Sequence, residues 1–180
     1  AVTGRCTHSG PNMAQVPAVK LGPNDEPLWG PEGVWGADCR SLFKAPKGRV
    51  MVGVDASGLE GRLFGHYLAR HDGGRYVDII LNGDMHSANQ KAAELPTRSN
   101  AKTFFYGWLF GAGDAKIGQI VGKSSKHGRM LKNKFKKNTK GIEELTDGVT
   151  KAAKRGFLKG LDGRILRIRH KHAALNTLLQ

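Results

Sequence analysis

The fold is decided by one stretch, Arg98-Ser-Asn-Ala-Lys102-Thr-Phe-Phe-Tyr106-Gly-Trp-Leu-Phe110-Gly. Its polar residues Arg98, Lys102 and Tyr106 stand four positions apart, which places all three on one face of an α-helix. The apolar residues between them supply a buried side. Two cations followed by a hydroxyl-bearing ring suit a triphosphate that lies along the helix, with its sugar at the ring end. A merely solvated polar face is the alternative.

A second helix is expected just before this one. Asp84 is placed to cap a helix over residues 86–94, Pro96 follows its end, and Thr97 can cap the central helix. The two helices then meet at a tight corner, which brings His86 near Arg98. A histidine beside two cations is a candidate third phosphate donor, although a lone histidine at a helix start is more often structural.

A carboxylate is expected at the end of a strand. Residues 49–54, Arg-Val-Met-Val-Gly-Val, have the pattern of a buried strand, and Asp55 follows directly. A turn and a helix come next, with Glu60 in the first helical turn. A carboxylate at the end of a buried strand is a common metal ligand. Asp55 could instead cap the helix that follows.

The charge of the chain is strongly uneven. The formal net charge is +14, and the window from Lys116 to Lys171 holds 17 basic residues against 4 acidic ones. A basic segment beside a nearly neutral remainder favours a polyanionic partner, with nucleic acid the first choice and solubility alone the alternative.

The cysteines, the apolar runs and the two ends of the sequence limit the class of protein. Cys6 and Cys39 are far apart and have no second thiol or histidine at ligand spacing, so we expect free thiols and no zinc site. No apolar run is long enough to span a membrane, and no signal peptide opens the chain. The chain starts with Ala1 and stops at Gln180 in a helical pattern, so we expect a piece of a longer protein.

Polar side chains near both ends suit nucleic-acid contacts. Near the start, a loop rich in turn-forming residues presents Arg5, Asn12 and Gln15. Near the end, a turn over residues 159–164 predicts a β-hairpin. A helix then places three neutral polar side chains in one row, suited to base edges or sugars: His172, Asn176 and Gln180.

Together these residues resemble family A DNA polymerases, most closely the replicative polymerases of short-tailed bacteriophages. Five collinear motifs carry the resemblance across the whole chain. They are Thr3-Gly4-Arg5 with Pro11-Asn12-x-x-Gln15-x-Pro17, then Val54-Asp55-Ala-Ser-Gly-Leu-Glu60-x-Arg62, Gly83-Asp84-x-His86, Arg98-x-x-x-Lys102-x-x-x-Tyr106-Gly, and Asn176-x-x-x-Gln180.

The resemblance implies a role for each candidate residue. Asp55 and the carbonyl of Ala56 would hold two Mg²⁺ ions, and Glu60 with Tyr106 would reject ribonucleotides. His86, Arg98 and Lys102 would bind the triphosphate of a dNTP, and Lys102 would also donate charge or a proton to the leaving pyrophosphate. The remaining set would follow the minor groove of the primer-template DNA: Arg5, Asn12, Gln15, His172, Asn176 and Gln180.

The chain departs from the family pattern in three places. Phe110 stands where many relatives have Tyr, so a hydroxyl contact on the template side is lost, and His172 stands where many cellular relatives have Arg. The third family motif, which supplies a second metal-binding Asp, is absent. His71-Asp72 is a poor substitute, because a helix-to-turn context surrounds it.

The resemblance predicts an incomplete α+β polymerase: palm over residues 1–65 and 161–180, mostly helical fingers over 66–160, and an apolar palm face left exposed. We expect DNA synthesis in the cytoplasm of an infected bacterial host, no activity from this chain alone, and a C-terminal palm segment supplied by the same or a separate chain. A non-catalytic nucleic-acid-binding module, a subunit of a split polymerase and a single-subunit RNA polymerase are the alternatives.

Overall fold

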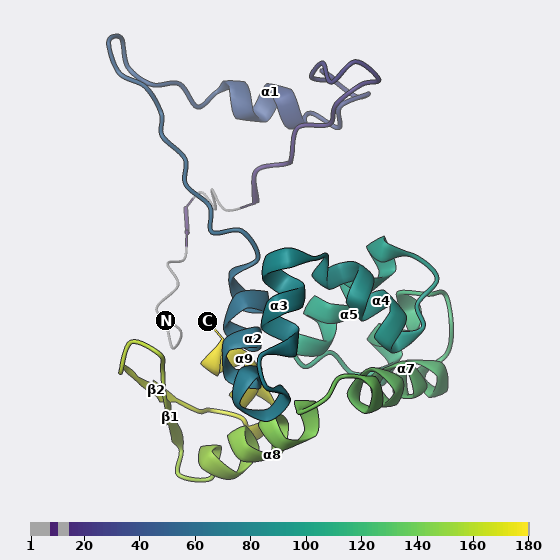
Figure 1. Cartoon of the computed structure of the whole chain (residues 1–180). Helices are drawn as coiled ribbons and strands as arrows, with labels where there is room; N and C mark the ends of the chain where they lie inside the picture. Colours follow the sequence, from purple (N-terminus) through teal and green to yellow (C-terminus); the bar gives the residue numbers. More distant parts are fainter. Residues whose placement is uncertain (1–7, 11–14, 180) are drawn as a thin grey trace. The chain divides into compact units, whose positions relative to one another are not determined.

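The computed structural model describes residues 8–10 and 15–179 (Figure 1). The chain divides into two compact units, one up to Ala56 and one from Ser57 onward. Helices dominate, and a two-stranded antiparallel sheet accompanies them, which confirms the α+β class expected from the sequence. No helix in the described part of the chain is long and apolar enough to cross a membrane.

The first unit has little regular structure. It holds the short helix α1, Gly36–Ser41, and an isolated antiparallel bridge between Leu21 and Pro27. Arg40 Nε donates a hydrogen bond to the carbonyl of Pro17 at 2.8 Å and so ties the helix to the preceding loop.

The buried strand expected over residues 49–54 is not formed. These residues have no regular secondary structure, and their side chains are exposed, up to 94% for Val54. A strand is stabilised by hydrogen bonds and side-chain contacts with a neighbouring strand. No strand in the described part of the chain pairs with this segment, so its β-prone sequence stays irregular and exposed.

The second unit is built from helices and one hairpin. In chain order the elements are α2 Leu59–Asp72, α3 Arg75–Asn82, α4 Met85–Ala93, α5 Arg98–Leu109, α6 Asp114–Gln119, α7 Ser125–Asn138, α8 Ile142–Ala153, β1 Phe157–Lys159, β2 Ile165–Arg167, the 3₁₀ turn η2 Lys171–Ala173 and α9 Ala174–Leu178. Helix α4 packs against α5 and α7, α2 packs against α3 and α8, and α6 packs against α7.

The core of this unit is aromatic and surrounds α5. Phe104, Phe105 and Trp108 of α5 are buried, and Phe64 of α2 and Phe135 of α7 meet them edge to face with ring centroids 5.1–6.5 Å apart. Such contacts combine a large buried apolar area with favourable ring geometry. The apolar side of α5 is therefore held between two helices, which leaves its polar side toward solvent.

The predicted hairpin is present. Leu158 of β1 pairs with Leu166 of β2, and both side chains are buried, while the flanking residues are not. The turn between the strands is closed by hydrogen bonds between Gly160 and its partners Gly163 and Arg164.

The single helix expected over His172, Asn176 and Gln180 is only partly present. His172 lies in η2, Asn176 lies in α9, and Gln180 lies outside the described residues. The backbone N–H of Ala173 donates to the carbonyl of His170 at 3.0 Å, an i to i+3 bond that tightens the turn. The tighter turn means that His172 and Asn176 do not share a regular α-helical row.

Candidate functional site

The corner between α4 and α5 is held by a capping side chain at each helix start. Asp84 accepts hydrogen bonds from the backbone N–H groups of His86 and Ser87 at 3.2 and 3.3 Å. Thr97 Oγ1 accepts one from the N–H of Asn100 at 3.0 Å. Each cap satisfies N–H groups that the first helical turn leaves unpaired. Both caps were predicted, and both are confirmed.

Arg98 lies at this corner in a bidentate ion pair with Asp84. Its Nε is 2.6 Å from Oδ2 and its Nη2 is 2.9 Å from Oδ1. The Arg98 guanidinium, helped by the Ser87 hydroxyl, holds the pKa of the Asp84 carboxyl well below its usual range, and the pair raises the pKa of Arg98. Sequence reasoning missed this pairing, although both residues stand at the starts of successive helices joined by a short connection.

His86 lies beside the cationic row, as the sequence predicted. Its ring centroid is 6.1 Å from that of Tyr106, and its Nδ1 is buried with no hydrogen-bond partner in the described part of the chain. Burial lowers the pKa of His86, and the charges of Arg98 and Lys102 lower it further against the opposing effect of Asp84. The lowered pKa favours the neutral imidazole. An anion bound beside His86 would raise this pKa again.

The polar face of α5 carries the expected row. Arg98 and Lys102 are exposed, Tyr106 is half-buried, and Phe110 just beyond the helix is exposed. The rings of Tyr106 and Phe110 stack with centroids 6.1 Å apart and planes at 29°. The row thus runs from two cations to a pair of stacked rings.

Glu60 acts electrostatically on the ring end of this row. Burial raises the pKa of the Tyr106 hydroxyl, and the negative charge of Glu60 raises it further. Glu60 is in the first turn of α2, and a Cβ on the adjacent Gly61 would lie only 2.7 Å from the sulfur of Met85, the first residue of α4. The glycine therefore leaves room for the Met85 side chain of α4 beside the first turn of α2.

Asp55 and Ala56 belong to the first unit, and the other candidate residues above belong to the second. The metal site that Asp55 and Ala56 would form stays a prediction. Among residues 8–10 and 15–179, no three His, Cys, Asp or Glu side chains gather as a metal-binding group.

The predicted DNA-groove residues are only partly described. Arg5, Asn12 and Gln180 lie outside the described residues. Gln15 is exposed in the first unit.

His172 lies in a turn beside the C-terminal end of α5, and Asn176 lies on the helix that follows this turn. The ring of His172 stacks on that of His170 with centroids 5.5 Å apart and planes at 14°. A Cβ on Gly111 would be 3.4 Å from the His172 carbonyl oxygen, so the η2 turn lies next to the residue that follows Phe110. Asn176 is half-buried and is the third residue of α9, which begins directly after η2.

Asp72, which the sequence did not favour as a second metal ligand, stabilises the start of α3. Its buried carboxylate accepts hydrogen bonds from the N–H groups of Gly74 and Tyr76, each at 2.8 Å. Both oxygens are used to cap the start of α3.

The fold is similar to part of a solved structure. The chain superposes with a TM-score of 0.71 on a solved structure described as the POL domain of Pol1 from M. smegmatis in complex with DNA primer-template and dNTP. The match has 20% sequence identity and covers 99% of this chain and 33% of the other.

The chain belongs to DNA polymerase family A, whose family model matches residues 1–179. It is 47% identical over 203 residues to the DNA-directed DNA polymerases of Enterobacteria phage T3 and Escherichia phage T7, a match covering 100% of this chain and 27% of each relative. It is 40% identical over 171 residues to that of Escherichia phage Phieco32. The chain thus spans about a quarter of the length of these relatives.

Proposed function

We propose that this chain contributes the nucleotide-binding part of template-directed DNA synthesis in a longer phage polymerase. The reaction is transfer of a deoxynucleotidyl group from a dNTP to the 3′ end of a DNA primer, in the cytoplasm of an infected bacterium. The observation that carries the proposal is the row Arg98, Lys102 and Tyr106 on α5, with His86 beside it at the capped corner. Family membership supplies the reaction class.

Triphosphate binding requires Arg98 to exchange partners. In the structure its guanidinium is paired with Asp84, and both side chains are substantially exposed. A triphosphate carries more negative charge than one carboxylate and offers the same bidentate geometry, so it can compete for Arg98. Lys102, one turn along the exposed face, adds a second charge. His86 takes up a proton or donates a hydrogen bond as the anion arrives.

The reaction is an in-line displacement. The primer 3′ hydroxyl loses its proton to water, and its oxygen forms a bond to the α-phosphorus as the bond from that phosphorus to the pyrophosphate oxygen breaks. Lys102 donates positive charge or a proton to the departing pyrophosphate. The residues of the α5 row act by positioning and charge stabilisation, which are the main sources of catalysis in phosphoryl transfer.

Magnesium fits the donors that this chain offers. Asp55 is an exposed carboxylate followed by the Ala56 carbonyl, and Mg²⁺ is commonly bound through one or two carboxylates together with substrate phosphates. Two such ions, when bound, neutralise charge on the attacking and leaving oxygens. Asp55 and Ala56 would hold them, and a second carboxylate would come from a C-terminal palm segment in the same or a separate chain.

Selection of the sugar and of the base pair involves different residues. Glu60 and Tyr106 would crowd the 2′ position, which is consistent with the electrostatic effect of Glu60 on the Tyr106 hydroxyl. The groove residues and Phe110 would contact primer-template DNA. Closure of α5 over a correct pair would precede the chemical step.

The isolated chain is proposed to be inactive, because one of the two metal-binding carboxylates is missing from its motifs. A non-catalytic nucleic-acid-binding module is the second candidate, and the excess of basic residues between Lys116 and Lys171 favours it. A subunit of a split polymerase would share the nucleotide site proposed above and would differ only in where the missing carboxylate resides.

Nucleotide binding tests the proposal directly. We expect the chain to bind a fluorescent dNTP in Mg²⁺, and Lys102→Ala to weaken binding about tenfold or more, the loss expected for one charge-assisted contact. Lys91→Ala is the matched control, because Lys91 is an exposed lysine on α4 without an ion pair in the described part of the chain. Equal affinity of the two variants would refute the site.

Primer extension tests the proposed inactivity. The chain alone should give no templated product with primer-template DNA, dNTPs and Mg²⁺. Templated synthesis by the isolated chain would show that a second carboxylate is not needed.

A further inference from the structure

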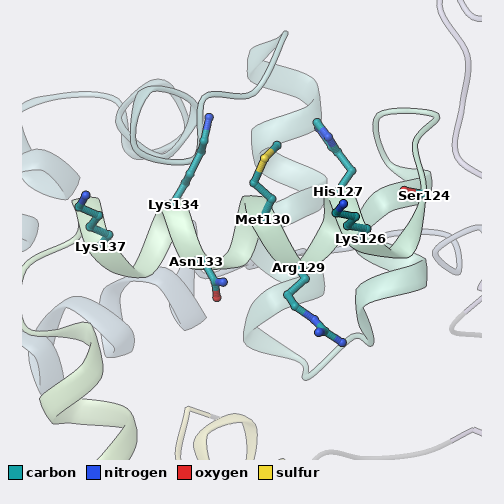
Figure 2. A pocket seen from close by; sticks show the side chains of 8 residues that line it. All are labelled: Ser124, Lys126, His127, Arg129, Met130, Asn133, Lys134 and Lys137. Atoms are coloured by element: carbon teal, nitrogen blue, oxygen red, sulfur yellow. The ribbon is translucent and has the colours of Figure 1, made fainter.

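Helix α7 has a basic face that takes no part in the proposed nucleotide site. Lys126, Met130, Asn133 and Lys137 follow one another at helical spacing and form its central row. Figure 2 shows Met130 in the middle of the helix, with Lys137 toward one end and Lys126 toward the other. Further side chains complete the lining of a shallow trough of about 560 Å³: Ser124, His127, Arg129 and Lys134.

This face points away from the α5 row. The opposite side of α7 is buried through Gly128, Leu131 and Phe135. Phe135 packs edge to face on Phe104 and Trp108, which belong to the buried side of α5. The core therefore separates the basic face of α7 from Arg98 and Lys102, and a ligand on one does not occupy the other.

The central row has uncompensated charge at both ends. Residues 116–140 include nine Lys and Arg and no acidic residue. Asp114 pairs with Arg129 at 3.1 Å and with Lys132 at 2.9 Å, and Glu94 pairs with Lys134. Lys126 and Lys137 are exposed and form no ion pair with any described residue.

The middle of the row is not charged. Met130 is 40% exposed, and Asn133 beside it presents an amide to solvent. The row spans about 16 Å, since each helical residue advances 1.5 Å. A charged contact on either side of an uncharged middle suits a flexible single strand, whose phosphates meet the cations while a base or sugar lies on the apolar surface. A purely acidic chain such as poly-glutamate offers carboxylates to the lysines and no ring to lie on the methionine.

We propose that the basic face of α7 binds a single-stranded segment of DNA, with phosphates at Lys126 and Lys137 and a nucleoside against Met130 and Asn133. The choice of DNA as the polyanion rests on the proposed function. The surface itself is separate from the dNTP site, so DNA binding to it is measured without dNTP or Mg²⁺, and dNTP binding serves as a separate control.

The test compares two double variants of the full chain. Binding of a fluorescent oligo-dT is measured by anisotropy over a range of salt concentrations. Removing two phosphate contacts with Lys126→Ala and Lys137→Ala should reduce the salt slope by about 1.4 and weaken binding about 25-fold at 0.1 M salt. Lys151→Ala with Lys159→Ala removes the same charge from exposed lysines on α8 and β1 and should have little effect.

Two further measurements distinguish single-stranded DNA from an acidic peptide as the ligand of this face. Met130→Ala should weaken oligo-dT binding severalfold and leave poly-glutamate binding unchanged. Equal losses in the two double variants, tighter binding of poly-glutamate than of oligo-dT, or no effect of Met130→Ala would overturn the proposal. The Lys126 and Lys137 double variant should still bind dNTP like the wild type. Normal dNTP binding with no oligo-dT effect would therefore reject this surface alone.

Discussion

Asp84 uses one carboxylate for two tasks. It caps α4 through the N–H groups of His86 and Ser87, and it pairs with Arg98 of α5. The second task occupies the guanidinium that the proposed function assigns to a triphosphate. The residue therefore holds Arg98 in place before the nucleotide arrives and competes with the nucleotide for it.

The ion pair predicts a pH dependence of stability. The pKa of Asp84 is lowered in the folded chain, so its charged form stabilises the fold above the ordinary pKa of about 3.9, and this contribution is lost as pH falls through the lower folded value. Asp84→Asn should lower the free energy of unfolding at pH 7, and the difference from wild type should shrink at pH 3. Urea unfolding of both proteins at pH 7 and pH 3 measures this difference in the free energy of unfolding.

Asp147→Asn is the control for this effect. Asp147 is exposed on α8 and forms no ion pair with a described residue. Its substitution should leave the free energy of unfolding nearly unchanged at both pH values. A loss in Asp84→Asn that is the same at pH 7 and pH 3 would mean that the charge of the carboxylate contributes nothing.

At the scale of elements, the pairing of α6 with α7 depends on a close backbone approach. A Cβ on Gly128 of α7 would lie 2.0 Å from the carbonyl oxygen of Asp114 and 2.7 Å from the N of Gly118, both on α6. No side chain rotation can relieve contacts with backbone atoms. Gly128 of α7 and Gly118 of α6 therefore let the two helices pack directly against each other. Helix α7 also contributes Phe135 to the core.

Gly128→Ala should therefore destabilise the helical unit. Overpacking typically costs about 1–3 kcal/mol, and we expect a net loss in this range even after the roughly 1 kcal/mol that alanine gains over glycine in a helix. Gly148→Ala is the matched control, because a Cβ there meets no heavy atom within 4 Å. That variant should be as stable as wild type or up to about 1 kcal/mol more stable in urea unfolding. Equal behaviour of the two variants would contradict the packing argument.

At the scale of the whole molecule, the chain presents an uncovered apolar segment. Val50, Met51, Val52 and Val54 are each at least 68% exposed, in a stretch with high β-propensity and no proline. Such a stretch pairs readily with another chain. The family resemblance predicted an exposed apolar palm face, and the assignment of this segment to a palm stays a prediction.

Val52→Lys should reduce self-association of the chain without altering its fold. A charge in the middle of the segment interrupts intermolecular β-pairing, and an exposed substitution changes the free energy of unfolding by less than about 0.5 kcal/mol. Sedimentation velocity at several concentrations measures the association. Leu81→Lys, at a 62% exposed position on α3, adds the same charge elsewhere and should leave association unchanged. Equal reduction by both variants would assign the effect to net charge.

Local signals predicted a substantial part of the fold. The caps at Asp84 and Thr97, the helix that follows each, and the hairpin around residues 159–164 are all present. Each depends on interactions within a few residues, which short sequence patterns report well. The row on α5 followed from helical periodicity alone. The separate helices α3 and α8 were not predicted, because each begins after a glycine and has no side-chain cap to mark its start.

The sequence by itself determined the family, the basic window and the order of residues along the α5 face, because these follow from residue identity and helical spacing. Tertiary structure decided the pairing of Arg98 with Asp84, the electrostatic effect of Glu60 on Tyr106, the approach of α6 to α7 and the absence of a strand at residues 49–54. These features depend on partners distant in the chain: a carboxylate binds whichever cation packing brings to it, and a β-prone segment becomes a strand only beside another strand.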